Sequence, residues 1–200
     1  MPRLSRAESQ ARTRDQLVTT AKELFLRDGY ATTSLERVAD AAGYSKGAVY
    51  SNFRNKDELC LAVLDRIHED QVAILASEMR PATTLEQRLA AFQAWAERSI
   101  GDPQWTSLEV EFATNVQRDQ RLRGELAKRD ETVRGMIAGL IASSAEEFGI
   151  HPPMPAERIA TALLSLGIGL GVQRAIDPSI PVDVLTDTIR VFLRASSPPD

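Results

Sequence analysis

Residues 33–56, TSLERVADAAGYSKGAVYSNFRNK, constrain the fold most, because two short helical patterns flank a glycine there. In the first pattern, apolar residues recur at helical spacing, at Leu35, Val38, Ala39 and Ala42. In the second, Val49 and Phe53 lie four residues apart, and Gly43 between the patterns tolerates the positive φ that ends a helix. This layout predicts a helix-turn-helix over residues 34–53, with a polar outer face on its second helix.

Capping residues predict where the helices of this stretch begin. Thr33 followed by Glu36 has the spacing of a capping box, in which each side chain bonds the other residue's backbone N–H. Ser45 is placed to cap the second helix. Asn55 followed by Glu58 marks a third helix start.

Lys56 then falls in the first turn of the third helix, where a cation is mildly unfavourable to the helix dipole. Its position suggests a task such as binding an anion. A solvated lysine is the alternative.

A longer helix precedes the motif. Its apolar stripe consists of Leu17, Val18, Ala21, Leu24 and Phe25, and Asp28-Gly29 ends it. We expect this helix and the two of the motif to pack as one small domain. Residues 1–10 form a basic arm, in which Arg3 and Arg6, followed by Arg12 and Arg14, outweigh Glu8. The arm is placed to approach a phosphate backbone or minor groove, and a disordered terminus is the alternative.

These residues resemble the DNA-binding domain of the tetracycline-repressor-like (TetR) family of bacterial transcriptional regulators. The resemblance runs from about Ala11 to Gln71, taken as a domain over residues 11–71, and rests on AKELFLRDGYATTSLERVADAAGYSKGAVYSNFRNKDEL. It implies DNA contacts by Thr33, Ser45, Lys46, Gly47, Tyr50 and Lys56. The family commonly has Tyr-His before the closing Phe, whereas this chain has Ser51-Asn52, and Asn52 would donate to phosphate instead.

The predicted DNA-contacting residues suit phosphates better than bases. The set is Thr33, Ser34, Ser45, Lys46, Gly47, Ala48, Tyr50, Ser51, Asn52 and Lys56. Its cations and hydroxyls suit phosphate, and Gly47 and Ala48 let the helix approach the groove floor. No Arg, Asn or Gln stands at the start of the second helix to read a base, so specificity would depend on Ser45, Ala48, Ser51 and DNA shape. For Tyr50, a half-buried core position is the alternative.

Charge supports a DNA-binding role only for the first third of the chain. The net charge of the 200 residues is −4, but residues 1–60 hold ten Lys and Arg against eight Asp and Glu. The single Cys60 excludes an internal disulfide and indicates a reducing compartment. Because no apolar run approaches the roughly 18 residues of a membrane span and no signal-peptide core is visible, we expect a cytoplasmic protein that does not contact a membrane.

Beyond Lys56 the sequence is nearly all helical pattern, broken by Pro and Gly. The breaks predict a fourth helix to about Arg80 and further helices over about 84–101, 104–118, 121–148, 156–177 and 182–195. The expected fold is all-α, with about nine helices: an N-terminal three-helix helix-turn-helix domain, then a C-terminal effector-binding and dimerisation domain over residues 72–200, as the resemblance implies.

Three glycines in the eighth helix, Gly167, Gly169 and Gly171, each lose about 1 kcal/mol of helix stability relative to Ala. Close approach of a partner helix would offset this loss. The last two helices of two copies would form a four-helix dimer interface, with Leu163, Gly167, Leu170, Gly171, Leu185, Thr188 and Phe192 as the contacts. The alternative is that both helices pack into their own core. Dimerisation would place two reading helices on a palindrome, about 34 to 36 Å apart.

Most aromatic residues outside the motif fall in the middle helices. The candidate effector pocket consists of Phe92, Trp95, Trp105, Leu108, Phe112, Met136 and Leu140. Ordinary helical core is the alternative for each residue; the resemblance favours a pocket for an apolar or aromatic small molecule. We expect no cofactor and no metal.

The sequence therefore predicts a DNA-binding transcriptional regulator, a repressor that a small molecule releases from a palindromic operator. A constitutive DNA-binding regulator or architectural protein without an effector is the alternative. An enzyme has little support and no candidate catalytic residues, because His68, His151 and Cys60 form no visible pairing of nucleophile and base.

Overall fold

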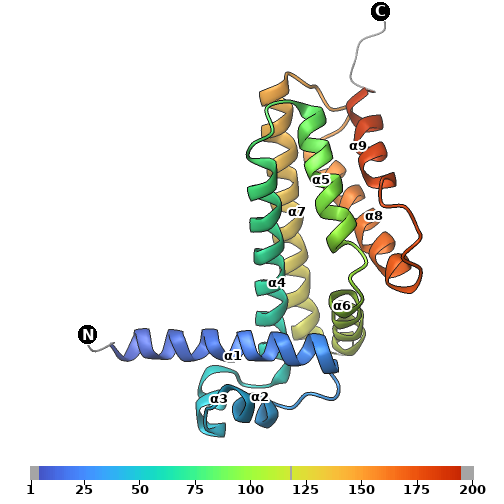
Figure 1. Ribbon diagram of the computed structural model, residues 1–200. Coiled ribbons are helices and arrows are strands. Elements are labelled where there is room, and N and C mark those ends of the chain that lie inside the picture. Colours follow the sequence, from blue (N-terminus) through green and yellow to red (C-terminus); the bar gives the residue numbers. More distant parts are fainter. Residues whose placement is uncertain (1–4, 118, 195–200) are drawn as a thin grey trace, which may run out of the picture. The chain divides into compact units, whose positions relative to one another are not determined.

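The computed structural model describes residues 5–117 and 119–194, which form nine α-helices and no strand (Figure 1). The helices are α1 (Arg6–Asp28), α2 (Leu35–Ala42), α3 (Lys46–Asn52), α4 (Lys56–Met79), α5 (Leu85–Ser99), α6 (Pro103–Val116), α7 (Gln120–Phe148), α8 (Ala156–Ile176) and α9 (Val184–Arg194). The predicted all-helical fold is confirmed, and the expected helices from the second onward end within about two residues of the observed ones.

The chain divides into two compact units. Unit 1 contains Met1–Asp70 and Ser107–Arg123, and unit 2 contains Gln71–Thr106 and Gly124–Asp200. The sequence predicted two continuous domains that meet at residue 71. The structure differs in grouping the second half of α6 with the first unit, where Phe112 lies edge-on to Tyr30 with 5.5 Å between ring centroids.

The N-terminal helix begins earlier than the sequence analysis expected. Ser5 and Glu8 form a capping box, with Ser5 N–H donating to Glu8 at 2.7 Å and Glu8 N–H donating to Ser5 Oγ at 3.2 Å. Residues 6–10 of the expected arm therefore belong to helix α1, and Arg12 and Arg14 also lie in this helix. The Arg3 part of the arm lies outside the described residues.

The start of α2 also differs from the prediction. Ser34 is the cap, because its Oγ accepts a hydrogen bond from Arg37 N–H at 3.1 Å. Thr33 is instead turned inward, with 1% of its surface exposed and its hydroxyl donating to Gly29 O at 2.9 Å. The capping box of Thr33 and Glu36 is therefore wrong, since α2 begins one residue later.

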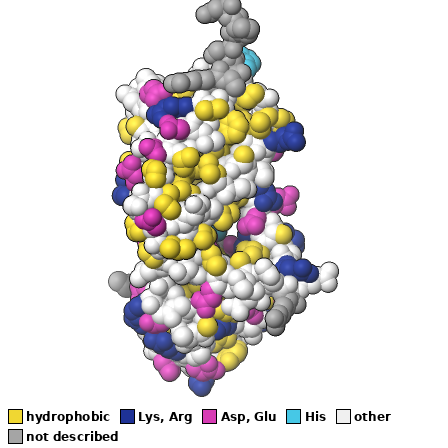
Figure 2. Space-filling model, turned by 90° about the vertical axis from the view of Figure 1, so that its right-hand side faces the viewer, with side chains coloured by type: hydrophobic (Ala, Val, Ile, Leu, Met, Phe, Trp, Pro, Cys, Tyr) yellow, Lys and Arg dark blue, Asp and Glu magenta, His cyan; other side chains and the backbone are white. Residues whose placement is uncertain are grey.

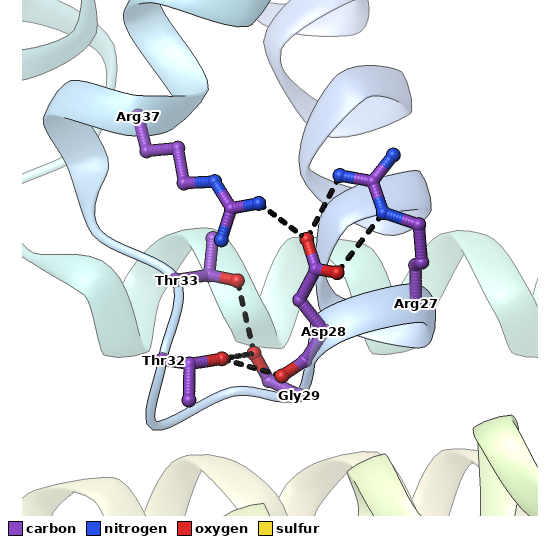
Figure 3. Close-up of polar contacts among 6 residues, drawn as sticks. All are labelled: Arg27, Asp28, Gly29, Thr32, Thr33 and Arg37. Atoms are coloured by element: carbon purple, nitrogen blue, oxygen red, sulfur yellow. Dashed lines mark hydrogen bonds and ion pairs between the residues drawn. The ribbon is translucent and has the colours of Figure 1, made fainter.

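Figure 3 shows how the turn between α1 and α2 is held. The carboxylate of Asp28, the last residue of α1, accepts hydrogen bonds from Arg27 at 2.8 and 3.0 Å and from Arg37 of α2 at 2.7 Å. The pKa of Asp28 is lowered, mainly by the hydrogen bond from Arg27. Thr32 Oγ donates to Asp28 O, so the end of α1 and the start of α2 are bonded to each other.

The other predicted helix starts of the motif are confirmed. Gly43 has a φ of 72°, a left-handed conformation that glycine adopts easily, and it ends α2. Ser45 Oγ caps α3 by accepting Ala48 N–H at 3.2 Å. Asn55 Oδ1 accepts Glu58 N–H at 2.9 Å, and α4 begins at Lys56 as expected.

Unit 1 has one apolar core. Its fully buried side chains come from α1, α2, α3, α4 and α6, and include Leu17, Phe25, Val38, Val49, Phe53, Leu59, Val63, Leu108 and Phe112. Burying one such side chain contributes about 1.5 to 3 kcal/mol. Cys60 is part of this core, and burial raises the pKa of its thiol.

Unit 2 has a separate core between α5, α8 and the segment from Val182 to α9. It consists of Ala96, Leu170, Val182 and Leu185, with Phe92, Trp95, Ile100, Leu166 and Ile180 packed against them. Gly101, with a φ of 90°, brings the turn after α5 against α8, and a Cβ on it would lie 2.3 Å from Arg174 Cβ. Arg174 of α8 stabilises this contact, because its Nε donates a hydrogen bond to Ile100 O at 2.9 Å.

Helix α8 is long and apolar enough to cross a membrane, with a mean hydropathy of 1.5, and 22% of its apolar stretch is buried. The sequence analysis, which counted uninterrupted apolar residues, expected no such segment. The difference arises because single polar residues within α8 leave its average hydropathy high.

Candidate nucleic-acid interface

Helix α3 presents a polar face because its apolar residues point inward. Val49 and Phe53 are each 1% exposed, and they anchor α3 in the core of unit 1. Lys46, Tyr50 and Ser51 are exposed on the opposite side, together with the capping Ser45. A Cβ built on the exposed Gly47 has Ser45 Oγ at 3.8 Å as its nearest described neighbour, so the backbone is open to approach there.

Most predicted DNA-contacting residues are accessible in the structure. Ser34, Ser45, Lys46, Gly47, Tyr50 and Ser51 are exposed, whereas Ala48, Asn52 and Lys56 are half-buried. Thr33 is buried, and the bond to Gly29 occupies its hydroxyl hydrogen. The structure thus gathers the set on α2, α3 and the start of α4, with Thr33 placed beneath the surface.

Tyr50 is exposed and has a defined partner. Its side chain is 52% exposed, and its hydroxyl donates to Glu36 Oε1 of α2 at 3.0 Å. This hydrogen bond, followed by the charge of Glu36, raises the pKa of Tyr50. The alternative of a half-buried core position does not apply to Tyr50, since half of its surface is open.

The polar side chains near the C-terminal end of α3 bond to the backbone of α3 itself. Ser51 Oγ donates to Ala48 O at 2.9 Å, and Asn52 Nδ2 donates to the same oxygen at 2.8 Å. Arg14 of α1 closes this end, with Nη1 donating to Asn52 O at 2.7 Å and the guanidinium carbon 4.1 Å from the centroid of the Phe53 ring. A cation at a helix C-terminus and over an aromatic face is stabilising, so Arg14 holds α3 against α1.

Lys56 lies in a different setting from Lys46. Its Nζ donates to Tyr30 O at 2.9 Å and to Ala31 O at 3.3 Å, and it lies 4.1 Å from the centroid of the Tyr30 ring. In this structure the ammonium therefore binds the α1–α2 turn to the start of α4. Its predicted contact with phosphate stays a prediction.

Glu111 of α6 holds the α1–α2 turn, a contact that the sequence analysis missed. Its carboxylate accepts the N–H groups of Tyr30 and Ala31, each at 2.9 Å, on the same turn that Lys56 holds through the carbonyl groups. Tyr30 is buried, and its hydroxyl donates to Asp57 of α4. Burial, and next this hydrogen bond, raise the pKa of Tyr30. Since 80 or 81 residues separate Glu111 from its partners on the turn, no local pattern could have revealed the contact.

The candidate pocket residues divide between the two units. Leu108 and Phe112 belong to unit 1, where they are 1% and 0% exposed. In unit 2, Phe92 and Trp95 pack against the core, and Trp95 Nε1 donates to Gln71 at 3.0 Å. Trp105 is half-buried, whereas Met136 and Leu140 of α7 are 43% and 41% exposed.

Two surface hollows of about 310 Å³ each lie in unit 1, and their linings contain none of these candidate residues. One is lined by α1 and α4, and the other by α1 and α3 beside Arg14 and Asn52. The effector pocket remains a prediction.

The predicted dimer residues lie on α8 and α9, but not all are on the surface. Leu170 and Leu185 are 4% and 2% exposed in the core of unit 2. Gly171 is also buried, and a Cβ on it would lie 3.8 Å from Gly101 N. A Cβ on Gly167 would meet no described atom within 4 Å. The remaining four are half-buried: Leu163, Gly167, Thr188 and Phe192.

The exposed apolar residues of α8 and α9 are not the predicted dimer residues but others close to them in sequence. On α8 they are Ile168, Val172 and Ile176, and on α9 they are Val184 and Val191, with exposed fractions from 36% to 82%. Figure 2 views the side on which α8 and α9 lie in Figure 1, and it shows hydrophobic side chains spread over unit 2. We call these five residues the α8–α9 face.

Two residues of types that enzymes use in catalysis have structural roles in this protein. Cys60 is buried in the core, and His68 Nε2 lies 2.7 Å from Glu109 Oε1 of α6. The sequence analysis found no partner for His68, since Glu109 is distant in sequence.

Two protein families match the chain. Residues 17–63 match the family described as bacterial regulatory proteins, tetR family, and residues 84–196 match the family described as BetI-type transcriptional repressor, C-terminal. The first match covers the second half of α1, α2, α3 and the start of α4, and the second covers α5 to α9.

Curated relatives are similar over parts of the chain. The transcriptional regulator TcmR of Streptomyces glaucescens is 33% identical over 138 residues, which are 66% of this chain and 60% of that protein. The activator FasR of Mycolicibacterium smegmatis is 40% identical over 52% of this chain and 49% of its own. The chain thus matches less than two thirds of these relatives' lengths. The repressor Rv1474c of Mycobacterium tuberculosis is 29% identical over 78% of this chain and 79% of its own.

Solved structures share the fold. A TetR-family regulator from Rhodococcus sp. aligns with a TM-score of 0.76 at 20% identity, over 92% of this chain and 99% of that one. Reduced NemR of E. coli aligns with a TM-score of 0.70 at 19% identity, over 90% and 97%.

Proposed function

Because the chain belongs to the TetR family of bacterial transcriptional regulators, and so is a helix-turn-helix DNA-binding regulator and not an enzyme, we propose that it is a cytoplasmic homodimeric repressor. It binds a palindromic operator through α2 and α3, and a small apolar or aromatic molecule releases it. The match of residues 84–196 to a repressor family supports repression over activation.

The observation that carries DNA binding is the polar face of α3. Ser45 and Lys46 at the start of α3 and Tyr50 further along it are exposed, and the other side of this helix is anchored in the core. Such groups bind phosphate oxygens, while Gly47 and Ala48 leave room for the groove floor. Few groups on this face can read a base in two-point contact, so DNA shape and the spacing of two copies supply much of the specificity.

A gel-shift titration on the DNA that flanks the gene, repeated at several salt concentrations, tests this function. Phosphate contacts release counterions, so the logarithm of the binding constant should fall linearly with the logarithm of the salt concentration. Undetectable or salt-insensitive binding contradicts DNA binding by this chain.

The α8–α9 face supports the homodimer. An apolar surface of this kind marks a protein or membrane partner, and a second copy brings an identical face in a twofold interface. Sedimentation velocity should give twice the chain mass of 22.0 kDa. Flotation with liposomes in place of dimerisation would instead make α8 a membrane-contacting segment.

Release by an effector requires a ligand that binds the two states of the repressor with different affinity. Trp95 and Trp105 lie in unit 2, so their fluorescence reports binding near the predicted pocket. A panel of aromatic and aliphatic compounds should contain one that changes this fluorescence and weakens the gel shift together. A constitutive DNA-binding protein predicts that no compound weakens the gel shift.

A further inference from the structure

One carboxylate lies among the predicted phosphate-binding groups. Glu36 Oε1 of α2 accepts a hydrogen bond from Tyr50 Oη of α3 at 3.0 Å. The positive charge of Lys46 also acts on it. These groups lower the pKa of Glu36, with its own N–H contributing most and Tyr50 next, so the side chain is ionised at neutral pH.

The groups around Glu36 form a set that suits a phosphate. A hydroxyl such as that of Tyr50 and an ammonium such as that of Lys46 are typical ligands of DNA phosphate oxygens. Ser34, Lys46 and Tyr50 are exposed, and all three belong to the predicted DNA-contacting set. A carboxylate resembles a phosphodiester in presenting two oxygens that share one negative charge.

We propose that Glu36 competes with DNA phosphate: in the free protein its carboxylate accepts the hydrogen bond of the exposed Tyr50 hydroxyl, and a phosphate that binds Tyr50 must displace it. The inference rests on the proposed function, DNA binding through α2 and α3. Every DNA sequence carries the same phosphates, so Glu36 lowers affinity for all sequences alike. It thereby limits non-specific binding without taking part in base recognition.

A different role for Glu36 makes opposite predictions. If Glu36 only positions Tyr50, its hydrogen bond persists in the DNA complex and helps binding. Glu36→Gln would then keep the accepting oxygen and leave affinity unchanged, and Glu36→Ala would weaken binding.

The test compares Glu36→Gln and Glu36→Ala with the wild-type chain on a random-sequence duplex and on the DNA that flanks the gene, at several salt concentrations. In water, a like charge about 4 Å from a phosphate weakens binding about fivefold. Both variants should therefore bind about fivefold more tightly for each DNA-binding unit, and about 25-fold more tightly as a dimer. The gain should be equal on the two DNAs. The slope of the logarithm of the binding constant against the logarithm of the salt concentration should steepen by up to about 0.9 for each DNA-binding unit.

Asp40→Asn is the matched control, since Asp40 is exposed on the same helix, one turn further on, and the substitution removes the same charge. It should give a smaller gain than Glu36→Gln. An equal gain from Asp40→Asn, no gain from Glu36→Gln, or weaker binding by Glu36→Ala overturns the inference.

The wild-type arm separates this inference from the proposed function. If the wild-type chain shows no salt-dependent binding to either DNA, the proposed function fails and the competitor role fails with it. If the wild-type chain binds and the Glu36 variants bind no better, only the competitor role is wrong. Thermal melting of each variant checks that it is folded.

Discussion

The α3 face of unit 1 and the α8–α9 face of unit 2 both project from helices anchored in a core, but their chemistry is opposite. On α3 the exposed side chains include Lys46, Tyr50 and Ser51, whereas Ile168 and Val191 are typical of the α8–α9 face. Water solvates a polar face well, so it can lose and regain its partner. An apolar face is unfavourable in water and suits a permanent partner. The difference fits the proposed roles, in which α3 binds DNA reversibly and α8 and α9 stay associated with a second copy.

The anchoring of α3 is where the largest effect on stability is expected. Phe53→Ala removes a side chain that is 1% exposed and also removes the ring beneath Arg14. It should lower the free energy of unfolding by about 3 to 5 kcal/mol in urea titration. Tyr50→Ala on the exposed side should change it by less than about 0.5 kcal/mol. Equal losses would show that the two sides of α3 do not differ as described.

A charge on the α8–α9 face tests whether that face is covered. Ile168 is 55% exposed in one chain, and Ile168→Asp would bury an unpaired carboxylate in a dimer. Its dimer dissociation constant should rise at least about 100-fold, which is about 2.7 kcal/mol. Ile74→Asp, at a site on α4 that is 45% exposed, is the control and should leave the dimer intact. Sedimentation equilibrium of both variants decides the matter.

Two glycines of unit 2 should respond in opposite ways to alanine. Gly101→Ala places a Cβ against Arg174 at a φ of 90°, and should destabilise the protein by about 2 kcal/mol. Gly167 lies within α8 in open space, so Gly167→Ala should stabilise a monomer by up to about 1 kcal/mol.

The dimer makes the Gly167 result informative. If a partner helix approaches closely at Gly167, the added methyl group weakens dimerisation although it favours the helix. Thermal melting at two protein concentrations separates these effects, because only the dimer contribution depends on concentration. Stronger dimerisation by Gly167→Ala would exclude close approach there.

Substitutions of Lys46 and Lys56 should separate DNA binding from structural support. Lys46→Ala should weaken binding to all DNA sequences and lower the salt slope by about one unit. Lys56→Ala removes hydrogen bonds to Tyr30 O and Ala31 O and should lower the free energy of unfolding by about 1 to 2 kcal/mol. A change in sequence preference from Lys46→Ala would contradict its phosphate role.

The smallest expected effect is at the start of α1. Ser5→Ala removes one half of the capping box with Glu8 and should lower stability by about 0.5 to 1 kcal/mol. The lowered pKa of Glu8 means that its share of this stability is present above its unfolded pKa of 4.5 and is lost as the pH falls through the lower folded value. Helix content measured by circular dichroism should therefore fall in acid more for wild type than for Ser5→Ala.

Local signals made the α2–α3 region predictable from sequence. Gly43, the caps at Ser45 and Asn55, and the inward Val49 each act within a few residues, so their effect can be read from spacing alone. The error at Thr33 arose because Ser34 is an equally good cap, and only the buried bond to Gly29 decides between them.

The features that the sequence did not reveal depend on contacts between residues far apart in the chain. Glu111 reaches the α1–α2 turn from α6, and no periodicity marks it. On α8 the apolar residues extend around the helix, so spacing could not select the exposed side. Packing of α5 against Leu170 and Leu185 makes that selection, which is why Ile168 and not Leu170 is open.

The position of Cys60 has a practical consequence for spectroscopy. Its thiol is 0% exposed and, with a raised pKa, stays protonated and unreactive at neutral pH. A cysteine introduced at an exposed site such as Ser51 would then be the single reactive thiol of each chain. A spin label there would report the distance between the two reading helices of a dimer in solution, without removal of the native cysteine.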